Sequence, residues 1–227
     1  MKLSIIIPAY NESSSIAQVL RGLLTLDLAD VKKEIVVVDD GSNDPTAAIA
    51  RSKGVTVVTH LINRGLGGAL GTGIEAALRR GADLIVTFDA DGQHAAEDIS
   101  KVIGPLLEEQ ADVVIGSRML NAAGMPWTRR VANHLANVIT RVLFGVWTTD
   151  SQSGLRAFSR SAAAQLRLTA NNYEVSSEIF REIRHHSLKF VEVPIRSIYS
   201  EYSLSKGQGF LMGLKTFLRM LLHMTER

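Results

Sequence analysis

The chain has 227 residues, of which 46% are hydrophobic and 21% charged, and its formal net charge is only +2. These values are ordinary for a globular protein, and the length suits one large domain with a sizeable core. The chain has no cysteine, which excludes disulfide bridges and thiolate metal sites. The first residues run straight into a strand-like segment without a signal-peptide pattern, so we expect a cytoplasmic protein.

The charge is unevenly distributed along the chain. Residues 1–115 contain 10 Lys and Arg against 16 Asp and Glu, a net charge of −6, whereas residues 116–227 contain 15 against 7, a net charge of +8. An acidic half suits a metal ion, and a basic half suits phosphate groups or an anionic membrane. No basic run is interleaved with aromatic residues, so we expect no nucleic-acid partner.

Short apolar runs alternate with amphipathic segments in the first half of the chain. Helices are expected from residue 16 onward and at residues 45–53, 69–80 and 97–109. Buried strands are expected at residues 3–8, 34–38, 55–59, 82–88 and 112–116. This alternation predicts an α/β fold with a mostly parallel, doubly wound sheet and right-handed crossovers.

The alternation fails after residue 116. Further elements are expected as helices at residues 127–144, 175–186 and 210–224 and as strands at residues 154–159 and 190–199. The first and last of these helices are too short and too charged to span a membrane, which takes about 20 apolar residues. Each of them either lies in the membrane interface as an amphipathic helix or caps the sheet as a core helix.

Two carboxylates, Asp89 and Asp91, directly follow one of the buried strands. The carboxyl ends of parallel strands are where open α/β sheets bind ligands. Carboxylates held so close repel each other unless a cation lies between them, and hard oxygen ligands suit Mg²⁺ or Mn²⁺ on a diphosphate. Gln93 adds a neutral oxygen. The alternative is that both aspartates only form a turn with Gly92.

Residues 8–12, 39–42 and 89–91 all follow predicted strands, so we expect these loops to converge on one ligand. Either Asp39 or Asp40 is suited to accept a hydrogen bond from a nucleotide base or a ribose, and the other is then a turn residue before Gly41. Tyr10 is suited to pack on the base ring. The residue types do not decide between the two aspartates.

The glycine-rich residues 65–71 resemble a dinucleotide-binding fingerprint, with Asp89 further along as the acid. Their position after the third strand, and the presence of Asp91 and Gln93, argue against a nicotinamide site. We expect the glycines to let the backbone approach a ligand or a neighbouring strand closely, with Arg64 available to a phosphate.

Six motifs stand in the order expected of family 2 glycosyltransferases with the GT-A fold. They are residues 6–12 (IIPAYNE), 38–42 (VDDGS), 63–67 (NRGLG), 89–94 (DADGQH), 116–118 (GSR) and 153–158 (SGLRAF). The resemblance covers nearly the whole chain. Within the family it is greatest to the branch of dolichyl-phosphate mannose synthases and polyprenyl-phosphate glycosyltransferases.

The resemblance implies an inverting, metal-dependent transfer of a sugar from a GDP-mannose or UDP-glucose type of donor to a polyprenyl phosphate. It implies donor binding by Pro8, Tyr10, Glu12, Asp39, Asp40, Arg64, Asp89 and Ala90. It implies Mg²⁺ or Mn²⁺ binding by Asp89, Asp91 and Gln93, with His94 nearby. The acceptor phosphate is assigned to Arg118 and to Arg129 or Arg130, and the catalytic residues are Asp91, Arg118 and Asp150.

Asp150 is the carboxylate expected to face the acceptor, either as an orienting group or, for a hydroxyl acceptor, as a base; a turn or N-cap role is the alternative. Three other functions stay open: a transferase with a saccharide hydroxyl acceptor, a dinucleotide-dependent oxidoreductase, and an idle sugar-nucleotide binding subunit.

We expect a catalytic domain over residues 1–206, with a donor half at 1–117 and an acceptor half at 118–206, followed by an amphipathic helix at 207–227. Similar enzymes often continue into transmembrane helices, whereas no transmembrane helix is expected in this sequence. We therefore expect membrane attachment to be peripheral, on the cytoplasmic face, or supplied by a membrane-protein partner.

Overall fold

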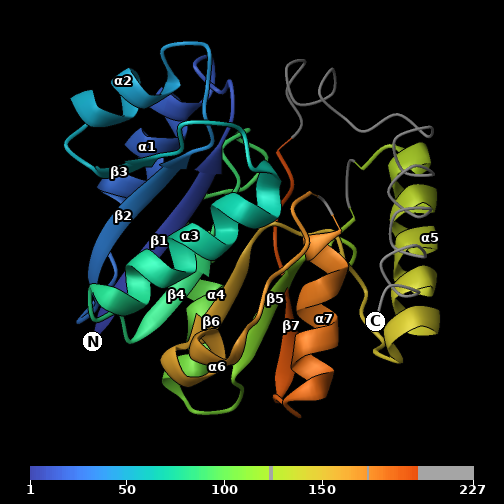
Figure 1. The fold of residues 1–227 in the computed structure, drawn as a ribbon. Coiled ribbons are helices and arrows are strands. Elements are labelled where there is room, and N and C mark those ends of the chain that lie inside the picture. The colour runs from blue at the N-terminus through green and yellow to red at the C-terminus, as the bar shows by residue number, and fades with distance from the viewer. Residues whose placement is uncertain (123–124, 173, 199–227) are drawn as a thin grey trace.

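The computed structural model describes residues 1–122, 125–172 and 174–198 (Figure 1). The predicted helix at residues 210–224 lies outside these residues. The first half contains the expected strands and helices in the expected order. They are β1 (Lys2–Ala9), α1 (Ile16–Thr25), β2 (Lys32–Asp39), α2 (Thr46–Ser52), β3 (Thr56–Thr59), α3 (Gly65–Arg79), β4 (Leu84–Thr87), α4 (Asp98–Leu107) and β5 (Val113–Ser117).

The second half adds α5 (Trp127–Phe144), β6 (Arg156–Ser159), α6 (Arg160–Gln165), α7 (Val175–His185) and β7 (Phe190–Pro194). The short α6 is not predicted by the sequence pattern, and β7 is shorter than the predicted strand. Helix α5 has the predicted limits, because Pro126 precedes it and Gly145 ends it in a left-handed conformation with φ of 67°. Among the described residues, no helix is both long and apolar enough to cross a membrane.

The strands form one sheet in the order β3-β2-β1-β4-β6-β5-β7. Every pairing is parallel except those of β6, which runs antiparallel to both β4 and β5. The expected mostly parallel, doubly wound sheet is therefore confirmed. Because β6 runs backwards, its first residue, Arg156, pairs with Thr87 near the carboxyl end of β4. The loop that precedes β6 consequently lies at the same sheet edge as the loops that follow β1, β2 and β4.

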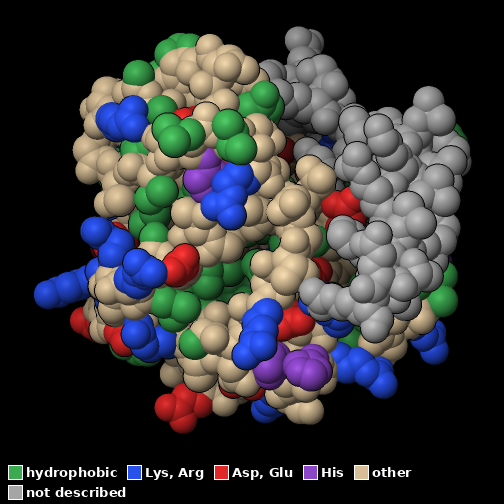
Figure 2. All heavy atoms as spheres, in the orientation of Figure 1, with side chains coloured by type: hydrophobic (Ala, Val, Ile, Leu, Met, Phe, Trp, Pro, Cys, Tyr) green, Lys and Arg blue, Asp and Glu red, His purple; other side chains and the backbone are tan. Residues whose placement is uncertain are grey.

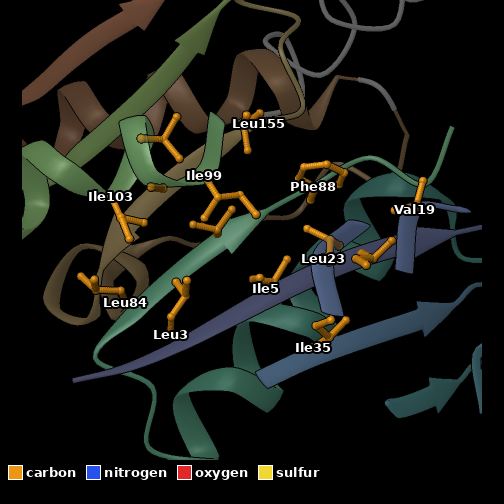
Figure 3. Packing of buried hydrophobic residues seen from close by; sticks show 14 of the residues in the cluster. Leu3, Ile5, Val19, Leu23, Ile35, Leu84, Phe88, Ile99, Ile103 and Leu155 are labelled. Atoms are coloured by element: carbon orange, nitrogen blue, oxygen red, sulfur yellow. The ribbon is translucent and has the colours of Figure 1, made fainter. Parts of the chain in front are cut away.

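Alternate side chains of each central strand pack on opposite faces of the sheet. Leu3, Ile5 and Ile7 of β1 are fully buried on the side of α1 and α4, and Figure 3 shows Leu3 and Ile5 with Leu23 and Ile103 in this cluster. Ile6 points to the other face and belongs to the cluster that α3, α6 and α7 cover. Burial on both faces explains why these strands are continuous apolar runs in the sequence.

Lys and Arg side chains do not form a single patch on the face seen in Figure 2. They lie scattered around the molecule there, with acidic side chains between them (Figure 2).

Candidate active site

The loops after β1 and β2 are joined by hydrogen bonds. The backbone N–H of Asn11 donates to Ser42 Oγ at 2.9 Å, and the Asn11 side-chain oxygen accepts from the backbone N–H of Asn43 at 2.9 Å. Tyr10 follows Ala9, which pairs with Asp39 across the two strands, and 43% of Tyr10 is exposed. These two predicted loops therefore form one wall of a site at the carboxyl edge of the sheet.

Asp40 is occupied by contacts within the protein. Its carboxylate accepts from the backbone N–H groups of Arg64 and Gly65, both at 2.8 Å, and lies 2.7 Å from Nδ1 of His60. The other ring nitrogen of His60 lies 3.0 Å from the Thr72 hydroxyl. Asp40 thus satisfies the first N–H groups of α3, in the way that acidic groups stabilise helix N-termini.

Asp39 differs from its neighbour. Only 2% of Asp39 is exposed, and its Oδ1 has no hydrogen-bond partner among the described residues. A buried acceptor without a partner is costly unless a ligand or water satisfies it. Of the two candidates that the sequence leaves open, Asp39 is the one with a free oxygen for a ligand.

The glycine-rich segment begins helix α3 at Gly65, so the helix starts earlier than the predicted residue 69. The backbone N–H of Gly67 donates to the carbonyl of Asn171 at 2.8 Å, and a Cβ on Gly67 would lie 1.7 Å from the carbonyl oxygen of Ala170. The glycines therefore admit residues 170–171 against the helix. Since Asp40 and Asn171 fill the N-terminus of α3, a dinucleotide pyrophosphate has no place there, which argues against the oxidoreductase alternative.

Asp89 lies against the loop that precedes β6. A Cβ on Gly154 would stand 2.0 Å from Oδ2 of the Asp89 carboxylate, so any larger residue would displace the carboxylate or the loop. The same Oδ2 lies 3.3 Å from Nε2 of His94. Burial works toward a higher pKa at Asp89, but the His94 ring and two nearby arginines outweigh it and lower the pKa.

Asp91 is held by Gln93. Its Oδ1 accepts from the backbone N–H of Gln93 at 3.0 Å, and its Oδ2 accepts from the Gln93 side-chain amide. Burial and the negative charge of Asp89 raise the pKa of Asp91. The side-chain oxygen of Gln93 accepts from Arg129 at 2.9 Å. Gln93 therefore bridges Arg129 and Asp91, and in this arrangement its oxygen does not face the two carboxylates as predicted.

The carboxylate pair fits a hard divalent cation. Burial and the charge of Asp89 both raise the pKa of Asp91, and a cation held by the two carboxylates would offset the second of these effects. No group of three or more His, Cys, Asp or Glu side chains in the described part of the chain forms a metal cage. Mg²⁺ is commonly bound by one or two carboxylates together with substrate phosphates and water, so the pair suits such an ion.

Arg118, which follows β5, and Asp150, in the segment before β6, form a bidentate ion pair. Nε and one terminal nitrogen of Arg118 each donate to the Asp150 carboxylate at 2.8 Å, and the Arg118 backbone N–H donates at 3.0 Å. Asp150 is fully buried. Both of its oxygens therefore accept hydrogen bonds from Arg118. The carboxylate thus orients the Arg118 guanidinium and is not free to act as a base.

The two other predicted acceptor arginines differ in position. Arg129, in the first turn of α5, is partly buried and contacts Gln93, so it lies at the site. Arg130 is exposed and donates to the carbonyl of Ala122. The geometry thus favours Arg129, a choice that the sequence leaves open.

A family model described as "Glycosyl transferase family 2" matches residues 4–167, which is well over half of the chain and includes every residue of this sheet edge named above except Ala170 and Asn171. The chain belongs to glycosyl transferase family 2. The glycosyltransferase is 41% identical over 240 residues to UDP-N-acetylglucosamine--dolichyl-phosphate N-acetylglucosaminyltransferase of Methanococcus voltae, covering 96% of this chain and 94% of that protein.

The glycosyltransferase is also 33% identical over 217 residues to polyprenol monophosphomannose synthase of Mycolicibacterium smegmatis, covering 90% of this chain and 80% of that protein. Among solved structures, glucosyl-3-phosphoglycerate synthase from Mycobacterium tuberculosis with Mg²⁺ and UDP superposes with a TM-score of 0.72. It covers 97% of this chain and 78% of that chain at 23% identity, which supports the fold alone.

The sequence pattern misses Arg156 as a residue of the glycosyltransferase site. Arg156 is 2% exposed, its Nε has no partner among the described residues, and one terminal nitrogen donates to the carbonyl of Ser151 at 3.0 Å. Burial lowers the pKa of Arg156 to about 10, although Asp89 and Asp150 act in the opposite direction. The sequence places Arg156 in a strand but does not show that it lies beside Asp89 and Asp150, because that depends on which strands flank β6 in the sheet.

Proposed function

We propose that this glycosyltransferase is an inverting, metal-dependent enzyme that transfers a sugar from a nucleotide donor to a polyprenyl phosphate. The observation that carries the proposal is the contact at Gly154, where the loop before β6 lies against the Asp89 carboxylate, which is also close to Arg118 and Arg156. Negative groups suited to a metal diphosphate and cations suited to a phosphate acceptor thus meet at one sheet edge. The pairing supports an acceptor that is itself an anion.

On the donor side, we assign the nucleotide to Pro8, Tyr10, Glu12 and Asp39, with Asp39 as the acceptor of a base N–H. Asp89 and Asp91 would hold Mg²⁺ or Mn²⁺. When bound, such an ion stabilises the charge that develops on the departing nucleoside diphosphate. Glucosyl-3-phosphoglycerate synthase has been solved with Mg²⁺ and UDP and with Mn²⁺ and UDP-glucose, which supports a divalent ion and a nucleotide sugar at this kind of site.

On the acceptor side, Arg118 and Arg129 supply the positive charge. The names of the Methanococcus voltae and Mycolicibacterium smegmatis relatives specify dolichyl phosphate and polyprenol phosphate chemistry, which supports a lipid monophosphate. A phosphate monoester is mostly dianionic at neutral pH because its second pKa is about 6. Such a nucleophile needs orientation more than deprotonation, and the pairing of Asp150 with Arg118 suits orientation.

The acceptor places the enzyme at a membrane. We propose that the chain attaches peripherally to the cytoplasmic face of the membrane, with a membrane-protein partner as the alternative. The proposed catalytic domain is residues 1–206, with its donor half ending near residue 117.

Donor turnover tests the function directly. Purified protein is mixed with Mg²⁺ or Mn²⁺, a panel of GDP- and UDP-sugars, and a polyprenyl phosphate in detergent, and nucleoside diphosphate release is followed. We expect release from one donor class that requires both the lipid phosphate and the metal. Release that a saccharide hydroxyl stimulates equally well without lipid phosphate would overturn the assigned acceptor.

Substitutions of the two adjacent aspartates, Asp39 and Asp40, should have different effects on donor affinity and on Tm. We expect Asp39→Asn to weaken donor binding about tenfold or more, because a buried hydrogen bond to a ligand is lost, with little change in Tm. Asp40→Asn should instead lower Tm, because it weakens the contacts to His60 and to the start of α3. Isothermal titration with nucleoside diphosphate and thermal unfolding measure the two effects. Equal losses of donor affinity would contradict the assignment.

A further inference from the structure

Helix α5 presents its apolar side to the outside of the molecule. Its exposed apolar residues, separated by three or four positions, are Trp127, Val131, Leu135, Val138 and Val142, of which Trp127 and Val142 are about three-quarters exposed, at 74% and 75%. This row is the outer face of α5. A surface helix normally turns its apolar stripe to the core. Single exposed apolar residues are common, but five in one continuous stripe indicate a contact surface.

The two buried residues of α5, Asn137 and Thr140, are polar, and its apolar residues Ile139, Leu143 and Phe144 are partly buried. The Asn137 side chain donates to the carbonyl of Thr149 and accepts from the backbone N–H of Ser151 at 2.8 Å, so it holds the backbone on both sides of Asp150. In Figure 1 the helix stands at the side of the sheet, next to α7. The helix is thus fixed to the acceptor loop by polar bonds, while the five apolar residues of its outer face remain exposed.

The charge of α5 indicates what covers the outer face. Residues 127–144 contain three arginines and one histidine and no acidic residue. Trp147 follows the helix, is 53% exposed and stacks against Arg141, whose guanidinium carbon lies 4.9 Å from its ring. Cations beside an apolar stripe, with tryptophan at the ends, are the features of helices that lie in the interface of an anionic bilayer.

We propose that the outer face of α5 binds the surface of an anionic lipid bilayer. This inference rests on the proposed function in one respect only, that the acceptor is a lipid phosphate. Because Asn137 ties the same helix to the loop of Asp150, and Asp150 pairs with Arg118, a bilayer bound to the outer face of α5 would be linked through this helix to the acceptor side of the site. The helix therefore serves both as the attachment surface and as the support of the acceptor site.

The intrinsic tryptophan fluorescence of the chain can report this contact. It has two tryptophans, Trp127 and Trp147, and both lie at the ends of α5. The full chain is titrated with vesicles of phosphatidylglycerol and phosphatidylcholine that contain no acceptor and no donor. We expect a blue shift of the tryptophan emission and protection from iodide quenching. Both effects should weaken at high salt and with phosphatidylcholine alone.

A matched pair of variants tests the surface. Val131→Ser/Val142→Ser removes two exposed apolar side chains from the outer face and leaves the helix intact, because valine and serine have similar helix propensities. Leu61→Ser/Ile62→Ser removes two apolar side chains, 100% and 73% exposed, from the loop before α3. We expect the first pair to weaken vesicle binding by about tenfold or more, because it removes apolar groups that the bilayer would bury, and the second to bind like the wild type.

Four outcomes would overturn the proposal. They are the absence of any emission shift with anionic vesicles, an equal loss in both variants, a wild-type dimer that only the α5 variant dissociates, and a fall in Tm confined to the α5 variant. The third would identify the outer face as a contact between two copies, and the fourth as a face covered by the chain itself. Because the vesicles lack donor and acceptor, failure of the turnover experiment leaves this result unaffected.

Discussion

Replacing Gly154 with alanine should lower kcat by about 100-fold or more, the scale of loss that a displacement of about 1 Å produces at a catalytic centre. The added methyl group would lie 2.0 Å from an oxygen of Asp89 and 2.2 Å from its carboxylate carbon, so either the carboxylate or the loop before β6 must move. Activation by Mn²⁺ should also require a higher metal concentration. Steady-state kinetics over a metal titration measures both effects.

Gly104→Ala is the matched control for this variant. Gly104 lies in α4, and an added Cβ there meets nothing within 4 Å. Alanine in a helix is favoured over glycine by about 1 kcal/mol, so this variant should keep its activity and gain slightly in stability. Wild-type kcat in Gly154→Ala would show that Asp89 tolerates displacement and would remove the contact on which the proposed function depends.

Arg118→Gln and Asp150→Asn should each raise the acceptor KM by about 10- to 100-fold with little change in the donor KM, because charge-assisted hydrogen bonds contribute about 1.5–3 kcal/mol. The two residues form one unit, so the double variant should bind the acceptor no worse than either single variant. Arg118→Gln alone should also be the least stable, since it leaves the fully buried Asp150 carboxylate without its cationic partner. Kinetics and thermal unfolding of the four proteins complete the cycle.

A catalytic base at Asp150 would give a different pattern. Asp150→Asn would then lower kcat with an unchanged acceptor KM, and Arg118→Gln would leave kcat intact. Arg160→Gln serves as the control for loss of an arginine. Arg160 donates to the carbonyl of Ala82 beside the start of β4, at the opposite edge of the sheet from the site.

The strands of the first half could be predicted because burial on both faces makes each of them a continuous apolar run. The same regularity placed the carboxyl-end loops side by side, and their joining through Asn11 and Ser42 follows from it. Helix α5 could be delimited because Pro126 and Gly145 bracket a period of 3.6 residues. Local signals therefore sufficed wherever the structure depends on neighbours in the sequence.

Other features depend on partners that are distant in the sequence. The start of α3 reads as a loop because its glycines have poor helix propensity, and only Asp40 and residues 170–171 explain why it forms. The difference between Asp39 and Asp40 arises from His60 and the α3 backbone. The role of Gly154 depends on β6 lying between β4 and β5, an order that the residue pattern does not contain.

The position of β6 also determines how the molecule folds. Both of its neighbours, β4 and β5, come from the chain before residue 118, whereas β6 comes from the chain after it. A fragment ending at residue 117 would leave two unpaired strand edges in the middle of its sheet, which favours aggregation. We expect a single cooperative unfolding transition and slow folding, because the central pairings join distant parts of the chain. The parts of the chain before and after residue 117 are thus interwoven in one sheet, and neither is a module that evolution or a protein engineer can exchange alone.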